Sequence, residues 1–422
     1  MTTKEKENLK ETLQEGNADK NIVSFRELIN FPSTTYGAFG IYRYPAKFIP
    51  HVVAYILENY GIKGMKVFDP FAGCGTTGLV ARIYGYDYEL WDLNPMLKIL
   101  HSIAVMSPIK VDFRDIINDL TTNKKEFIPK WSRIDYWFAP EFLPFLYQVW
   151  GYYHFTIKDN NLKLLLTVPL LKVTRYFSYD DQQRQKLSRS PKSKERIDGL
   201  LKQDWKKVFF TMLEKEFTKT LEKLEEYQTL SPKNVHGSIK AGVDVLKEQL
   251  EEEKDILITS PPYLQSQEYI RQSKMDLFWL GYSEEDVKNL SKLEIPYRNI
   301  SADMTIYSDT FLQYRASIND EHIKRVFDNY FKSVLTAFSS LQKNITTYLF
   351  IFVGHASMRG KGIPIDKVFI EHLSTMGWEH EKTLTDTIVS RRLFSYKVNP
   401  ATGLVDTRTQ IENLVILKRK TV

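Results

Sequence analysis

A glycine-rich segment at residues 66–78 most constrains the fold of this 422-residue chain. Its apolar residues predict a strand that ends at Asp69, and an amphipathic helix is expected from Leu79 onward. Glycines let a backbone approach a ligand closely, and the N–H groups of a helix N-terminus bind polar groups. The dinucleotide-binding pattern G-x-G-x-x-G, weak by itself, is matched by Gly73, Gly75 and Gly78.

A second carboxylate has the position expected in a nucleotide-binding sheet. The next predicted strand, residues 86–91, ends at Asp92, 23 residues after Asp69. In nucleotide-binding α/β folds an acid at this place binds ribose hydroxyls. Residues 66–106 continue as strand, helix, strand and helix, which predicts a parallel, doubly wound α/β sheet.

A rigid loop follows another predicted strand at residues 255–258. Two consecutive prolines fix φ and remove two backbone donors, so carbonyl groups are left as acceptors. The Ser260 hydroxyl, the Pro261 carbonyl and the Tyr263 ring could hold an exocyclic amine beside a stacked heterocycle. An isolated Pro-Pro turn would be the simpler interpretation, but its combination with the glycine loop favours a site.

Together these motifs resemble DNA amino-methyltransferases that act on cytosine N4 or adenine N6. Residues 69–77 resemble the S-adenosylmethionine loop of that family, and Asp92-Leu93-Asn94-Pro95 resembles its ribose-binding acid. Residues 259–263 resemble its catalytic Ser-Pro-Pro-Tyr motif, and residues 44–50 resemble the segment over the methionine end of the cofactor. The resemblance covers roughly residues 31–106 and 231–422.

The resemblance implies a Rossmann-like, S-adenosylmethionine-dependent methyltransferase sheet and a set of site residues. Those implied to be catalytic are Ser260, Pro261, Pro262 and Tyr263. Those implied to contact the cofactor are Lys47, Phe48, Asp69, Phe71, Ala72, Gly73, Gly75, Thr76, Thr77 and Asp92. Ser238 is added to them as a substitute, because His236-Gly237-Ser238 stands where many relatives carry Gly-Asp-Ala.

The implied reaction is direct attack of a base amine on the sulfonium methyl group, with the base flipped out of double-stranded DNA. In the family, serine at the first motif position is associated with methylation of cytosine N4, whereas Asp or Asn is associated with methylation of adenine N6. We therefore expect a sequence-specific N4-cytosine DNA methyltransferase, with N6-adenine as the alternative. The implied context is restriction-modification or defence, with a cognate restriction endonuclease as a candidate partner.

Composition excludes several other chemistries. Cys74 is the only cysteine and lies in the cofactor loop, so covalent methylation at cytosine C5 by a thiolate is excluded. We expect no metal site, because a cysteine zinc site and an H-E-x-x-H pattern are both missing. A net charge of +6 permits a polyanionic partner. Without an apolar stretch of membrane length or a signal-peptide core, we expect a soluble cytoplasmic protein.

The predicted organisation has four parts. We expect a charged tail at 1–30, the two catalytic halves at 31–106 and 231–422, and a mostly helical insertion at 107–230 that serves as target-recognition domain. The insertion carries a basic run that Ser and Pro residues should keep free of helix, suited to phosphate contacts but also typical of a solvated loop. The cations of that run are Arg184, Lys186, Arg189, Lys192, Lys194 and Arg196.

Two other classes of protein account for part of the pattern. An NAD-dependent oxidoreductase would use the glycine loop and Asp92 but leaves residues 259–263 without a role. A non-catalytic DNA-binding subunit would use the basic run but not the cofactor motifs. Methylation of RNA or protein is excluded only by the resemblance of the Ser-Pro-Pro-Tyr motif.

Overall fold

The computed structural model describes residues 20–44, 46–184, 186–264, 268–295, 298, 300, 304–354, 356–358, 361–387 and 411–421. Most of its strands are β1 (Lys20–Val23), β2 (Lys66–Asp69), β3 (Asp87–Asp92), β4 (Gly237–Ala241), β5 (Lys254–Thr259), β6 (Ile345–Gly354), β9 (Trp378–Thr387) and β10 (Ile411–Arg419). These eight form one sheet in the order β1-β9-β10-β6-β5-β2-β3-β4. The short strands β7 (Ala356–Met358) and β8 (Lys361–Ile363) pair separately.

The sheet is parallel from β4 to β6, and β10 runs antiparallel between β6 and β9. The strand order reverses beside β2, whose neighbours are β3 and β5. Open α/β sheets bind ligands at such a switch point, outside the carboxyl ends of the strands. The carboxyl ends of β2, β3 and β5 are Asp69, Asp92 and Thr259, so the three predicted motifs meet at one edge. The predicted doubly wound α/β fold is confirmed.

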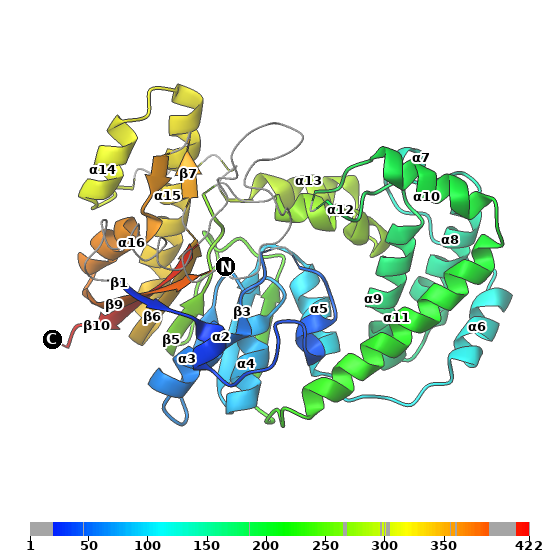
Figure 1. Ribbon diagram of the computed structural model, residues 1–422, viewed down its shortest axis with the longest axis horizontal. Coiled ribbons are helices and arrows are strands. Elements are labelled where there is room, and N and C mark those ends of the chain that lie inside the picture. Colours follow the sequence, from blue (N-terminus) through cyan, green and yellow to red (C-terminus); the bar gives the residue numbers. More distant parts are fainter. Residues whose placement is uncertain are drawn as a thin grey trace, which may run out of the picture.

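Helices cover both faces of the sheet (Figure 1). Side chains alternate along β5: Ile256 and Ile258 pack on one face, and Leu257 packs on the other. The first face is covered by α3 (Pro50–Tyr60), α4 (Thr76–Tyr84) and α5 (Met96–Val105). The second face is covered by α15 (Glu321–Leu341) and α16 (Ile365–Ser374). No helix in the described part of the chain is long and apolar enough to cross a membrane.

The last part of the predicted tail belongs to the fold. Strand β1 pairs in parallel with β9 at the edge of the sheet, and α2 (Phe25–Leu28) follows it. Phe25 is fully buried and packs edge-to-face with Tyr55 of α3, their ring centroids 5.1 Å apart. The prediction of a tail is therefore wrong for this part, because few apolar residues suffice to extend an existing sheet edge. Residues 1–19 lie outside the described part of the chain.

The segment between α5 and β4 is mostly helical, as predicted, and forms a separate lobe (Figure 1). Its helices are α6 (Phe113–Thr122), α7 (Ile134–Trp137), α8 (Leu143–Gly151), α9 (Asn160–Tyr176), α10 (Pro191–Leu201) and α11 (Trp205–Gln228). A π-helical turn, Tyr152–Thr156, extends α8. The long helix α11 packs against α9 and returns to the sheet, where the Tyr227 hydroxyl donates to the Leu79 carbonyl over 2.8 Å.

Half of the basic run is helical, contrary to the prediction. Ser190 caps α10: its hydroxyl accepts from the Ser193 N–H over 3.2 Å, and the Ser193 side chain accepts from the Ser190 N–H over 3.0 Å. Pro191 occupies the first helical position, where its missing N–H costs no hydrogen bond. Ser and Pro here begin a helix instead of preventing one, because they occupy its cap and first turn.

One helix from the second catalytic half joins the lobe to the sheet. Helix α12 (Tyr269–Trp279) places Trp279 in the aromatic core of the insertion, stacked on Trp150 with ring centroids 5.6 Å apart. Phe278 stacks on Trp131 at 4.7 Å. A single apolar cluster therefore runs from the sheet into the lobe.

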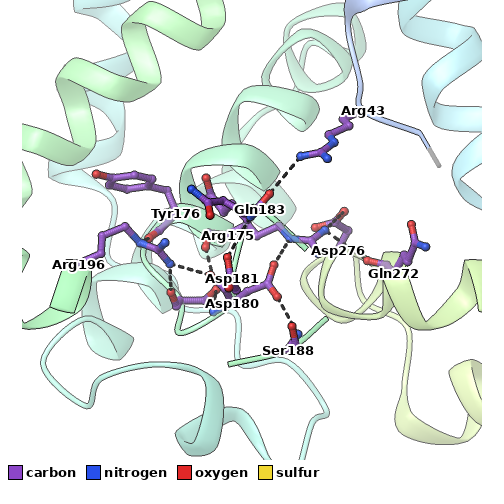
Figure 2. A network of polar contacts seen from close by, with 12 residues as sticks. Arg43, Arg175, Tyr176, Asp180, Asp181, Gln183, Ser188, Arg196, Gln272 and Asp276 are labelled. Carbon is purple, nitrogen blue, oxygen red and sulfur yellow. Dashed lines mark hydrogen bonds and ion pairs between the residues drawn. The ribbon is translucent and has the colours of Figure 1, made fainter. Parts of the chain in front are cut away.

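A buried ionic network reinforces this junction (Figure 2). Arg175 of α9 donates from Nε to Asp180 Oδ2 over 2.7 Å, and its Nη1 lies 3.8 Å from Asp276 Oδ2 on α12. Asp276 also accepts from the Tyr42 hydroxyl. Both carboxylates have side chains at most 3% exposed, so Arg175 supplies the positive charge that burial of these two acids requires.

Replacing Arg175 tests this junction. Arg175→Met would leave Asp180 and Asp276 buried without their cation, so we expect a loss of about 3–5 kcal/mol in the free energy of unfolding, measured by urea denaturation. Arg114→Met is the matched control, because Arg114 pairs with Asp112 where both side chains are exposed. It should leave the free energy of unfolding nearly unchanged. Equal costs for the two variants would contradict the assigned role of Arg175.

Candidate active site

Asp69 joins the glycine loop to the strand of the proline motif. This buried carboxylate accepts from the Thr77 hydroxyl over 2.5 Å and from the Thr259 hydroxyl over 2.6 Å. The Phe71 N–H also donates to it, over 3.1 Å. Burial raises the pKa of Asp69 to about 6, although these three donors act in the opposite direction. Asp69 and Thr77 thus hold the loop instead of facing the pocket.

The glycines of the loop have different structural roles. Gly73 and Gly75 adopt left-handed conformations, with φ of 58° and 86°. A Cβ on Gly73 would lie 3.1 Å from the Tyr44 ring, so only glycine permits this close approach. A Cβ on Gly78 would lie 2.7 Å from the side chain of Leu90 on β3. The third glycine therefore allows α4 to pack closely on the sheet.

Asp92 closes the loop from the end of β3. Its Oδ2 accepts from the Gly73 N–H over 2.8 Å, and its Oδ1 accepts from the Asn94 N–H over 2.7 Å. Burial raises the pKa of Asp92 to about 7, and the charge of Asp69 adds to the rise. The Asp92 carboxyl lines the pocket, so it is available to hydroxyl donors of a ligand.

A pocket lies over this edge of the sheet, with about 840 Å³ of space that is partly open to solvent. Three of the motifs found in the sequence contribute to its lining. The glycine loop contributes Pro70, Phe71, Ala72, Gly73 and Cys74; the end of β3 contributes Asp92, Leu93 and Asn94; and the proline motif contributes Ser260 and Pro262.

The other predicted cofactor contacts are distributed as follows. Lys47 and Phe48 line the pocket. The Lys47 ammonium donates to the backbone carbonyls of Thr34, over 2.9 Å, and Phe39. The Lys47 side chain therefore stabilises the position of the segment before α3. Gly75 and Thr76 lie just behind the pocket wall, at the start of α4.

Ser238 does not line this pocket. It pairs with Glu89 in the middle of the β3–β4 ladder, whereas the pocket lies at the level of Asp92 and Ala241. Three residues just beyond the end of β4, Val243, Asp244 and Val245, line it instead. Asp244 forms a bidentate ion pair with Arg298, with N–O distances of 2.6 and 3.2 Å. Asp244 lies three residues after the end of β4, and only the observed end of this strand identifies it.

The proline motif projects from the end of β5 into the site. Ser260 and Pro262 line the pocket, while Pro261 is buried behind them. Tyr263 is outside the described lining of the pocket, and its hydroxyl donates to Glu412 on β10. The four residues thus remain together, with only part of the motif facing the cavity.

Two tyrosines form another wall: one is the first residue of the 44–50 segment, and no motif identified the other. Tyr44 and Tyr269 line the pocket and stack with ring centroids 6.4 Å apart and planes 21° apart. Glu294 lies beside them and accepts from the Ile270 N–H over 2.9 Å. Burial raises the pKa of Glu294 to about 7. Sequence alone could not associate Tyr269 and Glu294 with the site, because the packing of α12 places Tyr269 there and the Ile270 N–H holds Glu294 beside it.

Two of the six predicted DNA-binding cations are held by the protein itself. Arg189 donates from Nη1 to the Tyr136 carbonyl over 2.8 Å, and its guanidinium lies 4.6 Å and 4.2 Å from the ring centroids of Tyr136 and Tyr179. Arg196 donates from Nη2 to the carbonyl of Ser178 over 2.7 Å. These guanidinium groups hold the turn between α9 and α10.

The other four cations are more exposed. Arg184 pairs with Asp181 at 3.4 Å and Lys186 pairs with Glu268 at 3.1 Å, and half or more of each cationic side chain is exposed. The exposed surface of α10 carries Lys192 and Lys194. Among the residues that the structure describes, no group of three or more His, Cys, Asp or Glu is placed to hold a metal ion.

Three curated proteins are similar to this chain, although no protein-family model matches it. The chain is 24% identical over 417 residues to the Type II methyltransferase M.MvaI of Kocuria varians, and the match covers 89% of each chain. It is 25% identical over 299 residues to the Type II methyltransferase M.BsoBI of Geobacillus stearothermophilus, covering 60% of this chain and 54% of the relative. It is 28% identical over 101 residues to the Type II methyltransferase M.MjaII of Methanocaldococcus jannaschii, and this match covers 24% of this chain and 19% of the relative. These similarities confirm the predicted resemblance to DNA methyltransferases.

The Thr259–Asp69 hydrogen bond is directly testable. Thr259→Val keeps the side-chain shape but removes one donor from a buried carboxylate, so we expect unfolding to become easier by about 1.5–3 kcal/mol. Denaturant unfolding measures this loss. Thr346→Val on the exposed surface of β6 is the control and should change stability by about 0.5 kcal/mol or less. If Thr259→Val costs as little as the control, the Thr259–Asp69 hydrogen bond does not stabilise the site.

Proposed function

We propose that this chain, a relative of the Type II methyltransferases, is a site-specific DNA methyltransferase that uses S-adenosylmethionine. The observation that carries the proposal is the single pocket shared by the glycine loop, Asp92 and Ser260. An oxidoreductase would have no use for the proline motif, and a non-catalytic subunit would have no use for the pocket.

The residues of the pocket fit the proposed cofactor. Left-handed Gly73 brings the loop backbone to the pocket wall, and the Asp92 carboxyl can accept from ribose hydroxyls. Phe48 and Leu93 supply apolar surface. The residues we propose to hold or support the cofactor are Lys47, Phe48, Asp69, Phe71, Ala72, Gly73, Gly75, Thr76, Thr77 and Asp92. When bound, S-adenosylmethionine supplies an electrophilic methyl group on a sulfonium sulfur.

The proline motif has the acceptors that a base amine requires. The lone pair of an aromatic amine is delocalised into its ring, so the nitrogen is a poor nucleophile. We propose that Ser260 Oγ and the Pro261 carbonyl each accept a hydrogen bond from one of its two N–H groups. These hydrogen bonds favour a pyramidal nitrogen whose lone pair is directed at the methyl group. Pro262 on the pocket wall keeps this segment rigid.

The target base must leave the duplex to reach this pocket, since its amine is inaccessible within the stack. We propose that Tyr263 stacks on the flipped base, with the Tyr263 ring oriented by the hydroxyl bond to Glu412. Ser260 favours N4 of cytosine, with N6 of adenine as the alternative base. Lys192, Lys194, Arg184 and Lys186 are proposed to contact DNA phosphates directly, and Arg189 and Arg196 to support them. A cognate restriction endonuclease is the partner expected in a restriction-modification setting.

The Asp92 assignment predicts a pH dependence of cofactor binding. Ribose hydroxyls donate to the ionised carboxylate, and the pKa of Asp92 is about 7 in the free protein. Affinity for S-adenosylmethionine should therefore be constant above pH 8 and fall by up to about tenfold per unit below pH 7. Asp92→Ala should weaken binding by about 1.5–3 kcal/mol at pH 8 and remove this step.

Titration calorimetry across pH measures both effects. Glu294→Gln is the control, because Glu294 titrates at about the same pH in the same pocket. A pH step that survives in Asp92→Ala but disappears in Glu294→Gln would assign the titration to Glu294. Unchanged affinity of Asp92→Ala at pH 8 would exclude Asp92 from the cofactor site.

The reaction itself is tested by product analysis. Unmodified DNA treated with the protein and labelled S-adenosylmethionine, then digested to nucleosides, should contain N4-methylcytosine. Ser260→Ala should mainly lower turnover, and Tyr263→Ala should lose about 1–3 kcal/mol of base stacking. Finding N6-methyladenine would preserve the mechanism and overturn the base assignment. Incorporation into neither base would overturn the proposed function.

A further inference from the structure

Two chain segments each place an aromatic ring in the pocket and a charged side chain beside its mouth. Tyr44 lines the pocket, and the preceding residue, Arg43, is exposed. Tyr269 lines the pocket, and the preceding residue is Glu268. Tyr44 and Tyr269 stack on each other, and both flanking residues contact the turn between α9 and α10: Arg43 through the Gln182 carbonyl and Glu268 through Lys186.

The insertion adds cations to the same surface. Arg43 donates from Nη1 to the Gln182 carbonyl over 3.0 Å, which joins the segment before the pocket to the turn between α9 and α10 (Figure 2). Lys186 of that turn lies 3.1 Å from Glu268, and Arg271 of α12 donates to the same carboxylate oxygen over 2.8 Å. The side chains of Lys186 and Arg271 are 50% and 51% exposed.

Glu268 is therefore shared by two cations that belong to different lobes. Its Oε2 accepts from both, so the carboxylate occupies the place between them where a second anion would bind. Surface ion pairs of this kind are individually weak. A polyanion that offers several phosphates can replace such a partner at little cost.

We propose that Glu268 acts as an internal competitor for a DNA phosphate. In the free protein Glu268 holds Lys186 and Arg271 together; when DNA binds, a backbone phosphate beside the flipped base takes both cations and Glu268 turns to solvent. Arg43 and Arg184 extend the same surface and contact neighbouring phosphates. This inference rests on the proposed function, because it assigns the backbone contacts of the DNA whose base enters the pocket.

The occupant is the DNA backbone because charge and position both favour it. The surface presents cations from three segments directly beside the pocket that the base must enter, and double-stranded DNA carries about one negative charge per 1.7 Å of its axis. The basic residues of α10, Lys192 and Lys194, belong to a separate element of the insertion. They provide a comparison within the same lobe.

The test measures affinity of the full-length protein for a labelled duplex oligonucleotide at several salt concentrations. Glu268→Gln should tighten binding by about two- to fivefold, because it removes the competing charge. Lys186→Gln and Arg271→Gln should each weaken binding and reduce the slope of log K against log salt by about 0.9. Lys186→Gln should still weaken binding in the Glu268→Gln background, because its phosphate contact remains to be lost.

Matched controls use charges at the opposite edge of the sheet, before the amino ends of β2 and β5. Lys63 and Glu253 are exposed there. Lys63→Gln and Glu253→Gln should leave affinity and salt slope within error of the parent protein. Thermal unfolding and S-adenosylmethionine titration of each variant verify folding. If Glu268→Gln disturbs the start of α12, the result for Lys186→Gln decides the test instead.

The outcomes separate the two proposals. A parent protein that binds and methylates DNA, combined with Glu268→Gln at unchanged or weaker affinity, overturns the competitor role. Parent salt slopes in both Lys186→Gln and Arg271→Gln overturn the assigned phosphate contacts. A parent protein that binds the cofactor but neither binds nor methylates DNA overturns the proposed function itself. Tighter binding by Glu268→Gln, with reduced slopes in the two cation variants, supports the inference.

Discussion

Three parts of the site depend on the buried carboxylate of Asp69. It receives hydrogen bonds from the first turn of α4, from the glycine loop and from the end of β5. The Thr259 hydroxyl belongs to a strand that is about 190 residues distant in sequence, so this contact fixes the proline motif relative to the cofactor loop. Because the donors surround the carboxylate, its burial does not leave an unpaired charge. The pocket can then form between two motifs that the chain supplies separately.

The insertion lobe is part of this arrangement. Trp279 enters its aromatic core, while Tyr269, at the other end of the same helix, lines the pocket. Arg175 crosses the junction to reach Asp276, and Asp276 also accepts from Tyr42, two residues before Tyr44. The two stacked tyrosines of the pocket wall, Tyr44 and Tyr269, are therefore anchored by one buried ionic network. Movement of the lobe would change the pocket, since helix α12 belongs to both.

Charges of opposite sign are divided between the pocket and its rim. Inside the pocket, burial keeps the pKa values of Asp92 and Glu294 near 7, where each can accept donors from a ligand. Around the mouth, exposed side chains such as Arg184, Lys186 and Arg271 present positive charge. This division suits a cofactor with hydroxyl groups and a positive centre inside, and a polyanion outside. A single surface of uniform sign could not serve both.

The sequence by itself determined the order of elements, the glycine loop, the acid at Asp92 and the proline motif. Each depends on local rules: strand burial, left-handed glycine and the fixed φ of proline. Tertiary structure alone decided that β1 joins the sheet and that Asp244, not Ser238, reaches the pocket level. It also decided which cations stay exposed. These outcomes follow from strand register and packing between distant segments, which no local pattern records.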